Sequence, residues 1–148
     1  MSGFLSRVIS LVLAFIMLVI APLLYSYSIS EMENRRLLLN EVNQFLDKVT
    51  DKGEITEDDL TEFYLEVSSY GMVIKPTVKR LVRTTVITPE GKAKTTYIAA
   101  DDIYSLNQRD VVQVTLKEIS ASNYRRILSS FLRVNEGLYH LEMAAVVR

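Results

Sequence analysis

The sequence contains no cysteine and only one histidine, His140. Disulfide bonds and thiolate chemistry are therefore excluded, so the folded part must be held by its own core or by neighbouring subunits. A single histidine rules out a multi-histidine metal site and argues against a histidine-based catalytic triad. These absences leave few ways to build an active site, and we expect neither enzymatic activity nor a bound cofactor.

Charge of neither sign predominates. The chain has 17 lysine and arginine residues against 18 aspartate and glutamate residues, which gives a net charge of −1. A nucleic-acid-binding domain normally carries a basic excess on one face, so we expect no nucleic-acid partner. The length of 148 residues leaves room for one compact domain once a membrane anchor is set aside.

Long apolar runs are equally scarce, and residues 4–27 form the only one in the sequence. Between residues 8 and 24 there is no charged side chain, and Ser10 supplies the only hydroxyl. A helix rises about 1.5 Å per residue, so this run can cross a hydrocarbon core of about 30 Å. Pro22 predicts a bend in that helix. The sequence therefore predicts a single-pass membrane anchor.

Two other interpretations of this run remain open. A buried helix of a soluble domain normally shows a polar stripe, which residues 4–27 lack. A cleavable secretory signal, with Arg7 as its basic region, would have an unusually long apolar stretch and bulky residues at its cleavage site. The basic residues on the two sides of the span do not decide its orientation, but large folded domains are translocated regardless of nearby charge. We therefore expect a cytoplasmic N-terminus and an extracytoplasmic body in the cell membrane.

After the span, apolar residues recur at steps of three and four, which predicts one face of an amphipathic helix. No proline or glycine interrupts residues 23–52, so we expect this helix to continue from the span and to end at Gly53. We predict a transmembrane anchor over residues 1–28, an amphipathic continuation over 29–53 and a head domain over 54–148. The apolar stripe of the continuation includes Leu38, Val42, Phe45 and Val49.

A second helix has the clearest start in the sequence. Thr56 is a natural N-cap, Asp59 stands three residues later as in a capping box, and Gly71 closes the segment. The neighbouring stretch DKGEITEDDL also resembles the second half of an EF-hand loop. In that register Lys48 and Lys52 occupy positions where calcium needs oxygen ligands, so we expect no calcium site.

From residue 72 the apolar period changes to two, which predicts β-structure. We expect residues 72–87 to form a short edge piece and a longer strand divided by Pro76, with a turn at 88–92 and a partner strand at 93–100. The hairpin is basic, and its candidate patch consists of Lys75, Lys79, Arg80 and Arg83. Such a patch fits a membrane surface or an acidic neighbour, but it also fits a solvated face that resists edge aggregation.

The remaining segments predict two strands with a helix between them. Asp101 and Asp102 are expected to form a turn or cap, in a connection with room for one helical turn. Residues 111–119 and 138–147 alternate as strands do, and Ser122 is a candidate helix cap. The core-facing stripe of that helix consists of Tyr124, Ile127, Leu128 and Phe131.

His140 and Glu142 stand at two-residue spacing in the last strand, opposite its apolar face. We expect a surface feature there and no catalytic or ligand-binding role. The predicted fold class is α+β. A long N-terminal helix, transmembrane and then amphipathic, precedes a small head with a capped helix, an antiparallel β-sheet and a second helix.

The order of these features resembles the type IV pilin-like proteins, in particular the minor pilins or pseudopilins of tight-adherence (Tad) systems of Gram-positive bacteria. A short leader, residues 1–3, is followed by Phe4, which opens a long apolar helix with a proline in its distal part. An amphipathic continuation and a small α+β head follow. Gly3 and Phe4 match the family's leader-peptidase cleavage point. Val8 stands where the family usually has a glutamate, and Arg7 follows the glycine that a basic residue usually precedes.

The resemblance implies a structural subunit that acts by packing. The spans of many subunits would pack in a filament or membrane complex, and the head would contact other pilin-like or apparatus proteins. The stripe Leu38, Val42, Phe45 and Val49 would continue that packing or seat the head. The rival function is a monomeric, single-pass accessory or sensing protein whose head binds a partner protein or a ligand, and self-association through the span distinguishes the two.

Overall fold

The structure, a computed structural model, describes residues 2–122, 125–126, 129–130 and 137–148. The chain divides into two compact units, Met1–Leu37 and Leu38–Arg148, which are described separately. The unit that contains the sheet thus begins inside the predicted continuation 29–53. The predicted stripe of the later helix lies outside the described residues, namely Tyr124, Ile127, Leu128 and Phe131.

The first unit is helical throughout its described residues. It consists of α1 (Ser2–Phe15), a π-helical turn η1 (Ile16–Ile20) and the start of α2 (Ala21–Lys52). Together they form the one helix among the described residues that is long and apolar enough to cross a membrane, with a mean hydropathy of 2.8 over its best window. None of that window is buried within the chain. The polar hydroxyl in the span is satisfied, since Ser10 Oγ donates to the Ser6 carbonyl at 2.9 Å.

The π-helical turn ends two residues before Pro22 and has a local cause. Proline has no N–H, and its ring clashes with the carbonyl four residues earlier, which belongs to Leu18. The backbone N–H of Ala21 accordingly donates to the carbonyl of Ile16, five residues back. The widened turn accommodates the proline without interrupting the helix.

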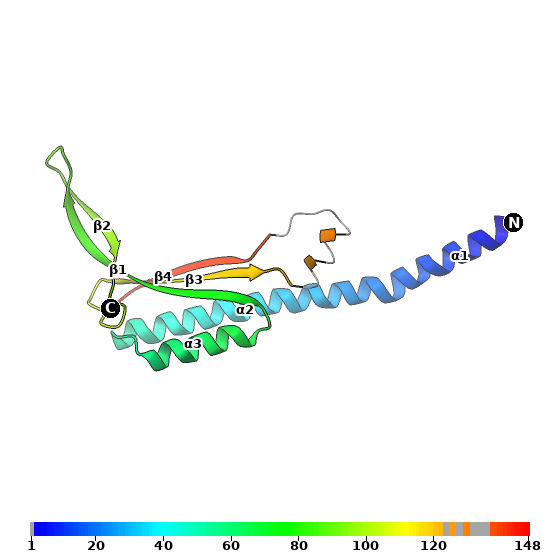
Figure 1. The fold of residues 1–148 in the computed structure, drawn as a ribbon, viewed down its shortest axis with the longest axis horizontal. Coiled ribbons are helices and arrows are strands. Elements are labelled where there is room, and N and C mark those ends of the chain that lie inside the picture. Colours follow the sequence, from blue (N-terminus) through cyan, green and yellow to red (C-terminus); the bar gives the residue numbers. More distant parts are fainter. Residues whose placement is uncertain (1, 123–124, 127–128, 131–136) are drawn as a thin grey trace. The chain divides into compact units, whose positions relative to one another are not determined.

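The second unit contains a four-stranded antiparallel sheet with the order β2-β1-β3-β4 (Figure 1). The strands are β1 (Val73–Ile87), β2 (Ala93–Ala99), β3 (Val111–Ser120) and β4 (His140–Val146). The predicted hairpin joins β1 to β2, and its turn is closed by a hydrogen bond from the Gly91 N–H to the Thr88 carbonyl at 2.8 Å.

One face of this sheet packs on two helices, the last part of α2 and α3 (Glu57–Ser69) (Figure 1). Alternate residues of β1 and β3 contribute to the core, and the partly buried residues of β4 pack against it. Its fully buried aliphatic residues include Leu38, Val42, Val49, Val67, Val112, Val114 and Leu116. The predicted α+β class is confirmed.

The local signals around α3 are also confirmed. Thr56 Oγ1 accepts a hydrogen bond from the Asp59 N–H at 3.2 Å, and Asp59 Oδ2 accepts one from the Thr56 N–H at 3.1 Å. These reciprocal bonds complete the capping box. Gly53 and Gly71 follow α2 and α3 with φ angles of +74° and +69°, a left-handed conformation that glycine adopts without strain.

The predicted division of residues 72–87 at Pro76 is wrong, because β1 is one continuous strand. Pro76 pairs with Leu116 of β3, whereas β2 pairs only with β1 residues from Leu81 onward. The β1 edge at Pro76 therefore has no β2 neighbour to which a backbone N–H would be donated. A proline costs no ladder hydrogen bond in such a place.

The connection between β2 and β3 forms no helical turn; it forms the predicted turn at Asp102 instead. The two Asp102 carboxylate oxygens accept hydrogen bonds from the Tyr104 N–H at 2.9 Å and from Ser105 Oγ at 2.7 Å. Ser105 in turn bridges to Glu54. These bonds satisfy the Asp102 carboxylate within the turn.

Candidate functional site

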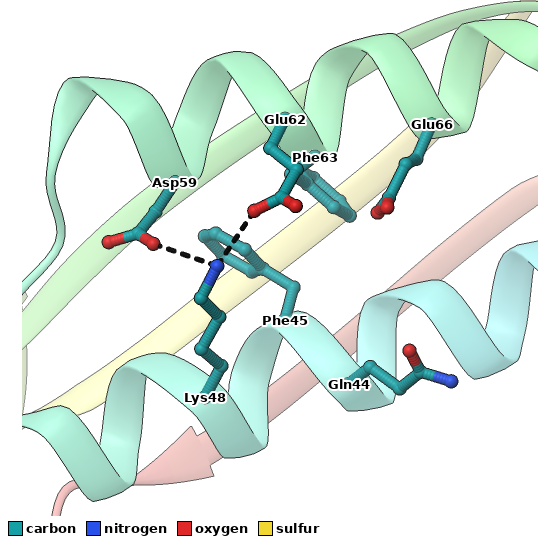
Figure 2. A pocket seen from close by; sticks show the side chains of 7 residues that line it. All are labelled: Gln44, Phe45, Lys48, Asp59, Glu62, Phe63 and Glu66. Atoms are coloured by element: carbon teal, nitrogen blue, oxygen red, sulfur yellow. Dashed lines mark hydrogen bonds and ion pairs between the residues drawn. The ribbon is translucent and has the colours of Figure 1, made fainter.

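A shallow groove lies between α2 and α3 on the surface of the second unit (Figure 2). Its floor is the stacked pair Phe45 and Phe63, whose ring centroids are 4.4 Å apart. Both rings are buried and belong to the core. The remaining lining residues are polar: Gln44, Lys48, Asp59, Glu62 and Glu66.

Lys48 bridges the groove from α2 to α3 (Figure 2). Its Nζ lies 2.7 Å from Glu62 Oε2 and 3.0 Å from Asp59 Oδ1. Hydrogen bonds to Glu62 and Asp59 raise the pKa of Lys48 above its ordinary value. The ammonium group therefore remains protonated at neutral pH, and it links the two helices without serving as a nucleophile.

Asp59 is buried and holds the start of α3. The Thr56 hydroxyl donates to Asp59 Oδ2 at 2.6 Å, and Lys52 approaches the same oxygen at 3.2 Å. The Thr56 hydrogen bond, with further contributions from Lys48 and Lys52, lowers the pKa of Asp59 well below its usual range. The folded chain thus binds a proton at Asp59 less tightly than the unfolded chain does.

Replacing Asp59 by asparagine should lower the free energy of unfolding by about 1–2 kcal/mol at pH 7, because the ion pairs with Lys48 and Lys52 are lost and the hydrogen bonds from Thr56 lose their charged acceptor. The depressed pKa gives the sign of the pH dependence. The stabilisation is fully present above the unfolded pKa of about 4 and is lost as the pH falls toward the lower folded pKa. In urea titrations of both proteins at several pH values, the gap in the free energy of unfolding should therefore begin to narrow below about pH 5 and keep narrowing as the pH falls further.

Glu62→Gln is the matched control, since it removes a carboxylate that also contacts Lys48 but is exposed. We expect a change of no more than about 0.5 kcal/mol and no convergence at low pH. If the difference in the free energy of unfolding between wild type and Asp59→Asn is the same at pH 7 and pH 3, the stabilisation does not come from the ionised Asp59 carboxylate.

The far end of the groove is acidic. The Tyr70 hydroxyl donates to Glu41 Oε1 at 2.7 Å, and this bond raises the pKa of Tyr70. Burial and the neighbouring Glu41 raise the pKa of Glu66. The groove thus has a neutralised end at Lys48 and a carboxylate-rich end at Glu66.

The groove lies between two helices, and its lining residues do not include the side chains that nucleophilic catalysis needs. None of the seven lining residues is a serine, threonine, cysteine or histidine, so a nucleophile paired with a base is not found there. Among the residues that the structure describes, no group of three or more potential ligands could hold a metal ion.

The predicted interaction stripe lies in the core of the second unit. Leu38, Val42 and Val49 are fully buried, and Phe45 is nearly so. These four side chains are covered mainly by the chain's own residues, and Phe45 also lines the groove.

The predicted basic patch requires a correction at Arg80. Lys75, Lys79 and Arg83 are exposed on one face of β1, whereas Arg80 is buried on the other. Side chains alternate along a strand, so Arg80 shares the inward register of Val78. Its Nε donates to Asp110 Oδ2 at 2.7 Å, and its Nη1 donates to the Asp102 carbonyl at 3.2 Å.

A second buried ion pair was not anticipated from the sequence. Glu118 is almost fully buried, forms an ion pair with Arg125, and accepts a hydrogen bond from the Tyr139 N–H at 2.7 Å. Glu118 continues the buried alternate positions of Val114 and Leu116 in β3. Strand periodicity was therefore the signal in the sequence that could have indicated its burial. The pair ties β3 to Arg125, which also donates to the Gly137 carbonyl at 2.7 Å.

The candidate cleavage residues Gly3 and Phe4 lie in α1, and Phe4 is exposed. His140 and Glu142 are exposed on one face of β4, as predicted, and His140 Nε2 lies 3.8 Å from Glu142 Oε2.

No protein-family model matches the sequence, and no curated protein or solved structure matches it either.

Proposed function

We propose that this protein is a membrane-anchored structural subunit of a type IV pilus or a Tad-like secretion or adhesion apparatus. The observation that carries the proposal is how one helix, Gly3–Lys52, is divided. Its first part is apolar and exposed, whereas its last part has one face buried in the core of the head. A single helix thereby supplies both the anchor and a core element of the domain to be displayed.

The exposed part of this helix needs a cover. Large apolar side chains are exposed throughout residues 4–20, and Phe4, Leu11 and Leu18 are each more than 70% accessible, at 77%, 73% and 76%. A soluble monomer rarely exposes an apolar patch of more than a few hundred Å². Lipid covers the helix before assembly, and the spans of neighbouring subunits cover it in the assembled filament.

In this function the protein acts by packing. The spans associate, the buried stripe of α2 holds each head on its own span, and the heads contact other subunits. The N-terminus is cytoplasmic and the head extracytoplasmic, and cleavage after Gly3 would make Phe4 the first residue of the assembled subunit.

The test is the intact mass of the chain recovered from native membranes and from filaments sheared off the cell surface. We expect a chain that begins at Phe4 in the sheared fraction. Its presence there also requires the head to be extracytoplasmic. Full-length chain confined to the membrane fraction would exclude incorporation into a filament.

Self-association through the span separates this function from that of a monomeric accessory protein. Because the chain has no native cysteine, single cysteines can be placed one at a time over residues 8–19 without background. We expect disulfide crosslinks at positions that recur every three or four residues. The control is Val42→Cys, which is fully buried and should give none. Absence of crosslinks along the whole series would leave the monomeric function.

A further inference from the structure

The outward face of α3 has acidic residues in its first turn and an exposed apolar residue about two turns further along. The helix contains five acidic residues and no basic one. Leu65 is 67% exposed and, by helical spacing, lies opposite the buried side of α3, together with Asp58. Glu57 and Asp58 are exposed, and within the described residues no ion pair engages either of them. We call Glu57, Asp58 and Leu65 the acid face.

The face of the sheet that points away from the helices has the opposite character. The register places Leu81, Val111 and Val146 side by side across three strands, which makes an apolar row. Lys79 and Arg83 of β1 stand on the two sides of this row, two residues from Leu81 in each direction. These five residues are called the sheet face.

Glu142 lies on this side of the sheet beside His140, but the lysines and the arginine here have no acidic partner within the described residues. Lys75 stands directly opposite Lys117 in the β1–β3 register, and Lys117 stands opposite His140. Like charges in directly opposed positions destabilise a sheet. Among the described residues, the ion pairs of the chain engage none of Lys75, Lys79, Arg83 and Lys117. An acidic surface from outside the head can therefore pair with Lys79 and Arg83.

We propose that the acid face of one subunit docks on the sheet face of the next subunit. Leu65 covers the apolar row, and Glu57 and Asp58, which both lie on one side of Leu65, approach whichever of Lys79 and Arg83 stands on that side of the row. The proposal rests on the proposed function, and it names which surfaces of the heads meet. The two faces lie on opposite layers of the head, so the contact is heterologous and links successive subunits head to tail.

The contact is small and does not have to hold the subunits alone. Chains anchored side by side in a membrane meet at a high effective concentration, so a weak contact between heads is sufficient. Charge complementarity then sets the register of neighbouring heads more than it sets their affinity.

The experiment uses disulfide crosslinking of the full chain in native membranes, with Leu65→Cys and Val146→Cys. Co-expressed single variants should give a mixed dimer, and the double variant should give a ladder of higher multimers. The matched control replaces Val146→Cys by Ile98→Cys. Ile98 is 52% exposed against 54% for Val146, but it lies on the opposite side of the sheet, so no ladder is expected.

Charge reversal tests the electrostatic part. Lys79→Glu with Arg83→Glu should reduce the yield of the Leu65–Val146 crosslink by about tenfold, as for the loss of two favourable charge contacts. Co-expression of this sheet-face variant with a chain carrying Glu57→Lys and Asp58→Lys should restore the mixed crosslink. Restoration identifies the paired surfaces, because a merely structural effect of either variant would add to the other.

Several results would overturn the proposal. Disulfides only between two Leu65→Cys chains, or only between two Val146→Cys chains, would indicate a closed dimer. Labelling of Val146→Cys by a maleimide attached to lipid headgroups, lost on Lys79→Glu with Arg83→Glu and without any head crosslink, would assign the sheet face to a lipid surface. Chain found in sheared filaments without head crosslinks would overturn this contact alone, whereas absence from filaments together with uncrosslinked spans would overturn the proposed function as well.

Discussion

Replacing Arg80 by methionine should lower the free energy of unfolding by about 3–5 kcal/mol, one of the two largest effects we expect. The methionine side chain fills similar space but leaves the Asp110 carboxylate buried without its counter-ion. It also removes the donor to the Asp102 carbonyl, which holds the turn before β3. The measurement is a urea titration of the full chain in detergent micelles, followed by circular dichroism.

Two further variants show whether this loss of stability comes from the buried pair of Arg80 and Asp110. Lys79→Met, one residue away but exposed, should change the free energy of unfolding by no more than about 0.5 kcal/mol. Arg80→Met combined with Asp110→Asn should recover much of the loss, because the asparagine is neutral and its oxygen can still accept the Asn107 N–H that Asp110 Oδ2 accepts at 2.9 Å. Equal costs for Arg80→Met and Lys79→Met would show that Arg80 is not a buried partner of Asp110.

The position of Arg80 shows what strand periodicity can and cannot predict. Alternation alone separates Arg80 from Lys79 and places it beside Val78, so its burial follows from the sequence once the strand is accepted. Its neutralisation does not follow, because Asp110 lies 30 residues away and is brought there by the sheet. Grouping basic residues by their proximity in the sequence therefore overstates the exposed patch by one member.

Features set by neighbouring residues are the ones that the sequence predicts well. The capping box of Thr56 and Asp59, the glycine after each helix and the β1–β2 hairpin all depend on contacts within a few residues. The apolar span is likewise a property of composition along one segment. These features locate the elements of the fold but not the surfaces between them.

The groove between α2 and α3 could not be predicted in this way. Lys48 and Glu62 are 14 residues apart and meet only because the two helices pack side by side. The same packing turns the stripe of α2 from a surface, as its periodicity alone allows, into part of the core. Which neighbour covers an amphipathic helix is a tertiary property that its own pattern does not contain.

Replacing Phe63 by alanine should also lower the free energy of unfolding by about 3–5 kcal/mol, since it empties a fully packed site. Phe63 is 1% exposed and stacks on Phe45, so the variant loses both burial and the aromatic contact. Tyr64→Ala is the matched control. Tyr64 is the next residue of α3 and is 37% exposed, and its replacement should cost less than about 1 kcal/mol.

The same two variants test separately whether the chain reaches the membrane and whether it enters the surface filaments. The span does not include Phe63, so both variants should reach the membrane in equal amounts. Loss of the Phe45–Phe63 contact uncovers the α2 stripe and loosens the head, and we expect Phe63→Ala to be depleted from the sheared surface fraction while Tyr64→Ala is retained. If Phe63→Ala is destabilised in urea but enters filaments at the wild-type level, a packed head is not needed for assembly, and the spans alone carry it.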